Sequence, residues 1–445
     1  MNNTSTGSVR ATNKLIPELR FPDFKGNREW NIESFGKLYS FKVTNSFTRD
    51  DLNYDNGSVK NIHYGDIHTK FSTLFDIRKE IVPYINSSLL IEKIKLECYC
   101  EEGDMIFADA SEDLDDIGKS IEIVCLNNEK LTSGMHTLLA RQLEPKVKVG
   151  FGGYLFKSNG IRTQIQKEAQ GTKVLGISIT RLSNIKIYYP QNKDEQQKIA
   201  SCLSSIDELI TTQSQKLETL KTHKKGLMQQ LFPAEGETLP KLRFTEFNDK
   251  GEWGVKCLGK ICDVRDGTHD SPNYVAQGYP LITSKNLLNT GMMDFANVSY
   301  LTREDYTQIN KRSKVDIGDI LFGMIGTIGN PVIVKIEGFA IKNVALIKDI
   351  GKLNQNFLVH QLKSDYIQKQ FEKVNAGGIL KFIALGIIRN LKVIVPSAKE
   401  QQKIADCLSS IDELITAQTQ KIEALKMHKK GLMQQLFPVM VTEQE

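Results

Sequence analysis

Residues 195–233 read EQQKIASCLSSIDELITTQSQKLETLKTHKKGLMQQLFP, and residues 400–438 read EQQKIADCLSSIDELITAQTQKIEALKMHKKGLMQQLFP. Over 39 aligned positions the two segments differ at six, so 33 are identical at a fixed offset of 205 residues. A repeat this close means that the chain has to be interpreted as two copies of one unit. The fold is therefore decided by what these two segments form.

Each copy carries a narrow apolar stripe whose steps alternate between four and three residues. This 3.5-residue spacing is typical of a coiled-coil seam. No proline interrupts either copy before Pro233 and Pro438, which mark the ends. At 1.5 Å per residue each helix would be about 55 Å long. The predicted seam consists of Ile199, Leu203, Ile206, Ile210, Leu217, Leu220 and Leu227 in the first copy, and of Ile404, Leu408, Ile411, Ile415, Ile422, Leu425 and Leu432 in the second.

A narrow stripe on a long helix needs a partner. Each helix could be buried on its own globule, or the two copies could pack on each other; we favour the second because the stripe is narrow and the copies match. A duplication related by a local pseudo-two-fold would make the pair an antiparallel coiled coil. The polar seam residues Gln213, Gln418, Lys224 and Lys429 could fix its register. Glycines at 226 and 431 indicate either a kink or a second protein packed there.

A second, shorter repeat precedes each globule and defines the order of the domains. Leu19-Arg20-Phe21 recurs as Leu242-Arg243-Phe244 at an offset of 223 residues. The chain is thus globule, helix, globule, helix. We expect a first globule at residues 1–192, a first long helix with its linker at 193–237, a second globule at 238–397, and a second long helix with a tail at 398–445.

The two globules mix short β-branched runs, turns and helical stretches, so we expect related α/β or α+β folds. GMIGTIG at 323–329 is glycine-rich, but it lacks the GK[ST] of a phosphate loop and is interpreted as turns beside strands. Residues 354–374 are predicted to form one amphipathic helix. Strands are predicted at 103–108, 120–126, 184–190, 279–283, 319–326, 330–336 and 391–396.

Composition narrows the class of protein. The formal net charge is +5. The second globule is clearly basic, with 21 Lys and Arg against 15 Asp and Glu over residues 238–398, whereas residues 1–194 carry 26 against 25. A basic surface suits a polyanion such as DNA. No apolar run approaches a membrane span and the N-terminus lacks a secretory signal, so we expect a cytoplasmic protein with no membrane partner and seven reduced cysteines.

At this point the layout resembles a known family, the specificity subunits of type I restriction-modification enzymes. The repeated helices carry the resemblance, together with VKNIHYGDI at 59–67 and RDGTH at 265–269. It implies two target-recognition domains, each reading one half of a bipartite DNA site. Because the globules differ, the half-sites should be asymmetric. The helices would set the spacing of the half-sites and dock two methyltransferase subunits, with restriction and translocase subunits completing a hetero-oligomer.

The same resemblance implies that this chain carries no catalytic residue. S-adenosylmethionine, ATP and Mg²⁺ would be bound by partner subunits, and no metal or cofactor by this one. In line with this, the sequence shows no N-P-P-Y-type methylation motif, no phosphate loop and no nuclease-like acidic cluster with a lysine. Cysteine and histidine spacing offers no zinc site, and the acidic run at 112–116 is interpreted as a solvated loop.

Bases are read by side chains that offer donors and acceptors, Arg or Lys for guanine and Asn or Gln for adenine. Each candidate could equally belong to a solvated loop or a turn, or be a satisfied core histidine. The candidates are Asn61, His63, Tyr64, His68, Thr69 and Lys70 in the first globule, and Arg265, Thr268, His269, Asn273, Lys285 and Asn286 in the second.

Two rival functions remain. A reader fused to a cleaving or methylating domain is disfavoured because duplicated units already occupy residues 15–438. A coiled-coil scaffold that binds only proteins leaves two large, divergent globules unexplained.

Overall fold

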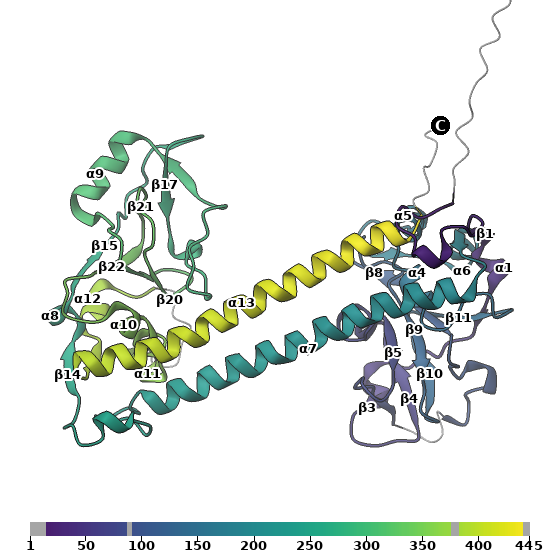
Figure 1. Ribbon diagram of the computed structural model, residues 1–445, viewed down its shortest axis with the longest axis horizontal. Coiled ribbons are helices and arrows are strands. Elements are labelled where there is room, and N and C mark those ends of the chain that lie inside the picture. Colours follow the sequence, from purple (N-terminus) through teal and green to yellow (C-terminus); the bar gives the residue numbers. More distant parts are fainter. Residues whose placement is uncertain (1–14, 87–90, 375–381, 439–445) are drawn as a thin grey trace, which may run out of the picture. The chain divides into compact units, whose positions relative to one another are not determined.

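The computed structural model describes residues 15–86, 91–374 and 382–438 (Figure 1). The chain divides into two units. Unit 1 consists of Met1–Thr212 and Ile422–Glu445, and unit 2 of Gln213–Lys421. Each unit therefore contains one globule, one half of each long helix and its own core.

The two repeats form the long helices α7 (Lys193–Leu231) and α13 (Ala398–Leu436), of 39 residues each. In unit 2, Gln418 Nε2 donates to the carbonyl and side-chain oxygens of Gln213 at 2.9 Å, and Lys224 Nζ lies 2.5 Å from Asp412 Oδ1. Position numbers rise along one helix as they fall along the other, so the helices are antiparallel. The prediction of an antiparallel pair with two related α+β globules is confirmed.

None of the fourteen predicted seam residues is exposed. Seven of them are half-buried. The other seven are buried, namely Ile199, Leu203, Ile206, Ile404, Leu408, Ile411 and Ile422. Both helices run on through Gly226 and Gly431, and a Cβ built on either glycine would meet no atom within 4 Å among the described residues. Neither glycine therefore serves a close contact inside the described chain.

The first globule is built on a five-stranded sheet of order β2-β11-β7-β9-β5, in which only the β5–β9 pairing is parallel. Beside it lies a four-stranded sheet of order β10-β4-β6-β3. Two further pairs, β1–β13 and β12–β8, are antiparallel. The strands are β1 Asn31–Ser34, β2 Tyr39–Lys42, β3 Leu52–Asn53, β4 Val59–Ile62, β5 Leu74–Asp76, β6 Tyr84–Ile85, β7 Met105–Ala108, β8 Ala110–Ser111, β9 Ser120–Cys125, β10 Lys130–Ser133, β11 Thr137–Gln142, β12 Leu175–Gly176 and β13 Lys186–Tyr189. Its helices are α1 Phe35–Leu38, α2 Tyr64–Thr69, α4 Gly152–Leu155, α5 Asn159–Glu168 and α6 Ile179–Asn184.

The second globule repeats this plan with two four-stranded sheets. One has the order β15-β22-β19-β20 and is antiparallel throughout; the other has the order β16-β18-β17-β21. A β14–β23 pair corresponds to β1–β13. The strands are β14 Gly254–Cys257, β15 Asp263–Asp266, β16 Tyr274–Val275, β17 Tyr279–Ile282, β18 Ser299–Leu301, β19 Ile320–Gly323, β20 Gly329–Ile333, β21 Ala340–Ile341, β22 Val344–Lys348 and β23 Lys392–Val395. Its helices are α8 Leu258–Ile261, α9 Arg303–Ser313, α10 Gln355–Leu362, α11 Asp365–Val374 and α12 Leu385–Asn390.

Each globule shares its core with both long helices. In unit 1, Leu203 of α7 and Leu436 of α13 are buried in one cluster with Tyr188. In unit 2, Leu231 of α7 and Leu408 of α13 lie in one cluster with Phe357. Burial of this kind stabilises by about 2 kcal/mol per large apolar side chain. The helix ends are therefore part of the globules, and only the middle segments lie outside these cores.

Most predicted strands are present, and the glycine-rich segment is the turn between β19 and β20. One prediction of secondary structure is wrong. Residues 354–374 form two helices, α10 and α11, rather than one. The break falls at Lys363–Ser364, where the Ser364 hydroxyl donates to the carbonyl of Gln361 at 2.6 Å. Serine side chains compete with the backbone for such hydrogen bonds, and this explains why the helix ends there.

Candidate nucleic-acid interface

In the first globule the candidate residues lie around α2, directly after β4. The helix begins at Tyr64, and its N-cap is His63, whose Nδ1 accepts from the backbone N–H of Gly65 at 3.1 Å. Burial, followed by the charge of Arg49, lowers the pKa of His63, so the ring is neutral at neutral pH. Its ring centroid lies 4.6 Å from that of Tyr64. His63 therefore caps the helix and packs against the ring of Tyr64.

A buried aspartate organises the charged part of this surface. Asp66 is fully buried, and its Oδ1 pairs with Arg49 at 3.1 Å and with Lys70 at 2.9 Å. Both cationic side chains are 51% exposed. The ammonium of Lys70 also lies 5.7 Å from the centre of the Tyr54 ring. The aspartate thus fixes two cations that still face solvent.

Aromatic rings complete the first surface. His136 packs edge-on against Tyr64 with centroids 5.4 Å apart, and has a φ of 58°. His68 is half-buried, with Nε2 3.2 Å from the carbonyl of Ala110. Thr69 is exposed, and its hydroxyl donates to the carbonyl of Gly65. A half-buried tyrosine between histidines next to two fixed cations is suited to contact both phosphate and base.

In the second globule a corresponding role falls to Asp266, at the end of β15. Asp266 is buried; one of its oxygens accepts from Arg312 and the other lies 2.8 Å from His269 Nε2. Arg312 is 67% and His269 50% exposed. The hydrogen bonds to Asp266 and then Asn343 raise the pKa of His269, which favours its cationic form.

The remaining candidates of the second globule are spread more widely. Arg265 is held by Asp263 at 2.6 Å and also donates to the carbonyl of Arg312. Thr268 is half-buried and accepts from the backbone of Asp270. Asn273 and Lys285 are exposed. Only Arg265 and His269 are thus tied to the cluster around Asp266 and Arg312.

Two candidates are buried and do not reach the surface. Asn61 is buried, and its Oδ1 accepts from Asn45 and Thr132. Asn286 is 4% exposed, and its amide closes a turn with Thr283, Asp294 and Asn297. Buried amides are normally used for internal hydrogen bonds. In this structure neither side chain is available to a base, so their choice as reading residues is corrected.

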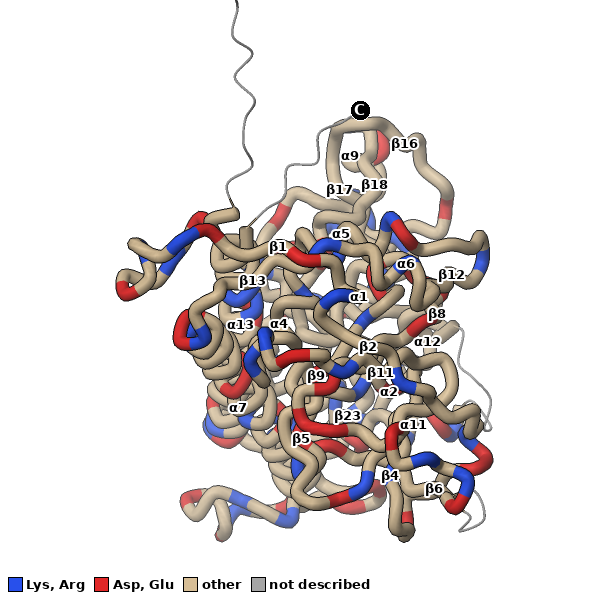
Figure 2. Tube along the Cα trace, turned by 90° about the vertical axis from the view of Figure 1, so that its right-hand side faces the viewer, with Lys and Arg blue, Asp and Glu red and all other residues tan. Residues whose placement is uncertain are grey.

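Sequence reasoning missed Arg49, Tyr54, His136 and Arg312. Each reaches its cluster from a distant part of the chain, so no local motif contains it. A signal existed only for Arg312, which belongs to the basic end of a predictable helix, α9. Figure 2 shows basic and acidic residues interspersed along the trace.

Other chemistry is not indicated on the described residues. No group of three or more His, Cys, Asp or Glu among them could hold a metal ion, and all seven cysteines are free. Within the acidic run at 112–116, Asp113 closes a turn and Asp116 pairs with Lys119 at 3.2 Å. None of the helices in the described ranges is long and apolar enough to cross a membrane.

Comparison with known proteins assigns the family. The type I restriction modification DNA specificity domain matches twice, at residues 56–222 and 250–427. The chain belongs to this family. Two specificity-domain copies thus coincide with the two globules and their helices.

Relatives agree with the specificity-domain assignment. A putative type I restriction enzyme MjaX specificity subunit from Methanocaldococcus jannaschii is 30% identical over 75% of this chain and 77% of its own length. The MjaVIII specificity subunit of the same organism is 28% identical over 66% of this chain and 72% of its own. A crystal structure of a type I S subunit from M. genitalium superposes with a TM-score of 0.60 at 16% identity, covering 96% of this chain and all of that one.

Proposed function

We propose that this chain is the DNA-recognition subunit of a type I restriction-modification complex, and that each globule reads one half of a bipartite, asymmetric site. One observation carries the proposal. The two globules share one scaffold, yet each presents its own pair of exposed cations on a buried aspartate, Arg49 and Lys70 on Asp66, and Arg312 and His269 on Asp266. Cations fixed in this way can position a duplex through its phosphates and read guanine edges.

The long helices are proposed to set the spacing between the half-sites. Half-sites one helical turn apart lie about 34–36 Å from each other. A 39-residue helix is about 58 Å long, which is sufficient to span that distance. Because each globule core includes residues of both helices, the number of residues between the cores would determine the spacing.

The helices are also proposed to dock two methyltransferase subunits. Leu209 and Leu414 occupy equivalent positions and are 49% and 56% exposed. Exposed leucines repeated on two surfaces suit two copies of one partner. Restriction and translocase subunits would join the same complex. Catalysis, and the binding of S-adenosylmethionine, ATP and Mg²⁺, are assigned to those partners.

The purified chain tests the division of labour. It should bind duplex DNA without methylating or cleaving it when S-adenosylmethionine, ATP and Mg²⁺ are supplied. Methylation or cleavage by the chain alone would refute the assignment of catalysis to partners.

A separate experiment tests the spacing role. Inserting one heptad into the middle of both helices lengthens each by about 10.5 Å. With partner subunits present, the two half-site sequences should be retained and the spacer between them should lengthen, or the complex should fail to assemble. A complex that still modifies DNA at the original spacing would rule out the helices as the spacing element.

A further inference from the structure

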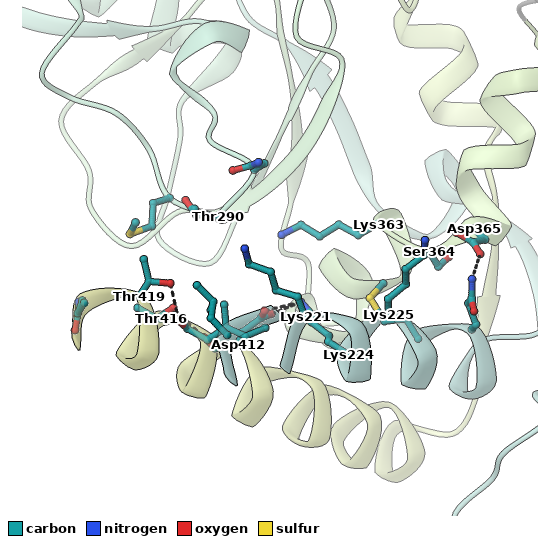
Figure 3. A pocket seen from close by; sticks show the side chains of 17 residues that line it. Lys221, Lys224, Lys225, Thr290, Lys363, Ser364, Asp365, Asp412, Thr416 and Thr419 are labelled. Atoms are coloured by element: carbon teal, nitrogen blue, oxygen red, sulfur yellow. Dashed lines mark hydrogen bonds and ion pairs between the residues drawn. The ribbon is translucent and has the colours of Figure 1, made fainter. Parts of the chain in front are cut away.

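Unit 2 contains a cavity of about 540 Å³ between its globule and its halves of α7 and α13 (Figure 3). Four lysines line it, Lys221, Lys224 and Lys225 from α7 and Lys363 from the α10–α11 connection. Figure 3 shows Lys363 reaching in from the globule side and Thr290 above the helices. A cavity of this size matches those that hold ligands or anchoring side chains.

The charges around the cavity are not balanced internally. Its two carboxylates are already engaged, Asp412 by Lys224 at 2.5 Å and Asp365 by the amide of Gln229 at 3.0 Å. By contrast, the ammonium groups of Lys225 and Lys363, which also line the cavity, form no hydrogen bond or ion pair among the described residues, although the charge of Asp412 acts on Lys363. Burial, followed by the charge of Lys224, lowers the pKa of Lys363. A negative group entering the cavity would relieve that electrostatic cost.

In unit 1 the lysine at the same place is hydrogen-bonded. Residues 154–165 align with 360–371 at an offset of 206, so Lys157 corresponds to Lys363. Its ammonium donates to the Thr73 hydroxyl at 2.7 Å. Tyr154 donates to Asp207 at 2.8 Å, and Lys429 pairs with the same aspartate.

In unit 2 the ion pair has its counterpart in Lys224 and Asp412, whereas the other two contacts are missing among the described residues. The position of Tyr154 is taken by His360, whose Nδ1 lies 3.9 Å from Asp412 and has no hydrogen-bond partner. Among the described residues no hydroxyl plays the part of Thr73 toward Lys363. A Cβ built on Gly291 would lie 3.4 Å from the ammonium. The two units therefore differ in one respect that bears on binding, an unpaired cation beside a cavity.

The rest of the lining defines what could enter. Leu217, Met228, Ile415 and Met292 contribute apolar surface to the cavity. A DNA duplex, whose major groove alone is about 12 Å wide, is too broad to enter such a cavity. A bare inorganic anion would leave the apolar part uncovered. Carboxylates next to a leucine-like side chain would satisfy both parts, by charge complementarity and by apolar burial.

We propose that this cavity docks an acidic segment of a partner protein, with one apolar side chain on Leu217, Met228 and Ile415 and its carboxylates on Lys225 and Lys363. Because the ammonium of Lys157 already donates to the Thr73 hydroxyl in unit 1, one such segment binds per chain. The site therefore distinguishes the two ends of an otherwise duplicated helix pair. This interaction is independent of DNA reading.

Binding of a fluorescein-labelled peptide of sequence Glu-Glu-Leu-Leu-Glu-Glu to the full chain, followed by anisotropy, tests the proposal. Lys363→Met and Lys225→Met keep the apolar stems and remove the charges, and each should weaken binding about fivefold. Lys430→Met is the matched control, because Lys430 is the unit 1 copy of Lys225 in the same local sequence. It should leave binding unchanged. Peptides with Gln for Glu, or Ser for Leu, should bind more weakly than the parent.

Several results would overturn the inference. These are no binding by the unmodified chain, equal binding by Lys363→Met and Lys225→Met, or equal weakening by Lys430→Met. Full competition by inorganic pyrophosphate, or equal binding of the Ser-for-Leu peptide, would show a simple anion site instead. If a short DNA duplex displaced the peptide from the unmodified chain but bound neither variant, the two lysines would be DNA-binding residues instead. Circular dichroism of each variant checks folding, and Lys225, on an exposed helix face, keeps the test valid if Lys363→Met does not fold.

Discussion

The junctions between globules and helices differ sharply from the outward surfaces of the same globules. At the junctions several polar contacts are duplicated. Arg20 pairs with Glu195 at 2.7 Å in unit 1, and Arg243 pairs with Glu400 at 2.7 Å in unit 2. Gln196 accepts from the backbone of Lys148, as Gln401 does from that of Asn354.

The outward surfaces, meaning the clusters around Asp66 and Asp266, do not repeat each other's contacts. Asp66 holds an arginine and a lysine beside tyrosines, whereas Asp266 holds an arginine and a histidine. The contrast shows that the chain preserves how each globule is attached and varies what each globule presents. This is the pattern expected when two globules are attached to the helices in the same way but recognise different DNA sequences.

The largest effect should come from breaking the duplicated ion pairs. Glu195→Ala leaves Arg20 buried and uncompensated, and we expect a loss of about 3–5 kcal/mol in the free energy of unfolding of unit 1. Glu400→Ala should do the same in unit 2. The only two tryptophans are Trp30 in unit 1 and Trp253 in unit 2, so single-tryptophan variants report each unit separately in urea.

The exposed Glu218 gives the control, since Glu218→Ala should cost less than about 1 kcal/mol. If either glutamate variant proved as mild as this control, the two junctions would not be equivalent in energy.

A smaller effect should distinguish the units by pH. Burial raises the pKa of Glu122 to about 7, although the backbone N–H groups of Gly153 and Gly150 oppose the shift. A carboxyl whose folded pKa lies above its unfolded pKa contributes stability at low pH and loses it as pH rises through the folded value. Unit 1 should therefore lose on the order of 2–3 kcal/mol between about pH 4.5 and 7 through this group.

Glu122→Gln should remove that part of the pH dependence from the Trp30 transition and leave the Trp253 transition unchanged. The measurement is urea unfolding of both variants over this pH range. An identical pH profile before and after substitution would show that the pKa of Glu122 is not raised in the folded protein.

The smallest effect concerns a junction contact that differs between the units. Asp207 accepts from Tyr154 and Lys429, whereas Asp412 accepts only from Lys224 among the residues that the structure describes. Asp207→Ala should therefore cost about 1–2 kcal/mol and Asp412→Ala about 1 kcal/mol or less. Equal costs in the two units would mean that the tyrosine contributes nothing to the attachment.

The sequence predicted the scaffold well because the scaffold is periodic and repeated. The alternating seam steps define both long helices, and the shorter repeat of Leu19-Arg20-Phe21 contains the arginine that pairs with Glu195. The split between α10 and α11 was missed because an apolar pattern continues through Lys363, while the break depends on the hydrogen bond made by Ser364.

The outward surfaces were predicted only in part, for a different physical reason. Tyr64, Lys70, Arg265 and His269 belong to short motifs and are at least partly exposed. Asn61 has the right chemistry for a base but is buried, and burial is set by strands that pair with distant parts of the chain. Arg49 and Arg312 reach their aspartates over 17 and 46 positions, which no local pattern reveals.

The central claim is that the two globules recognise their half-sites independently while the same helix pair holds both. The most direct test is an exchange of residues 38–190 for the equivalent segment of another specificity subunit. The exchanged chain would be expressed with its methyltransferase partner, and the modified sites in genomic DNA would be sequenced. We predict that one half-site changes while the other half-site and the spacer are retained. A change in both half-sites, or in neither, would contradict the account.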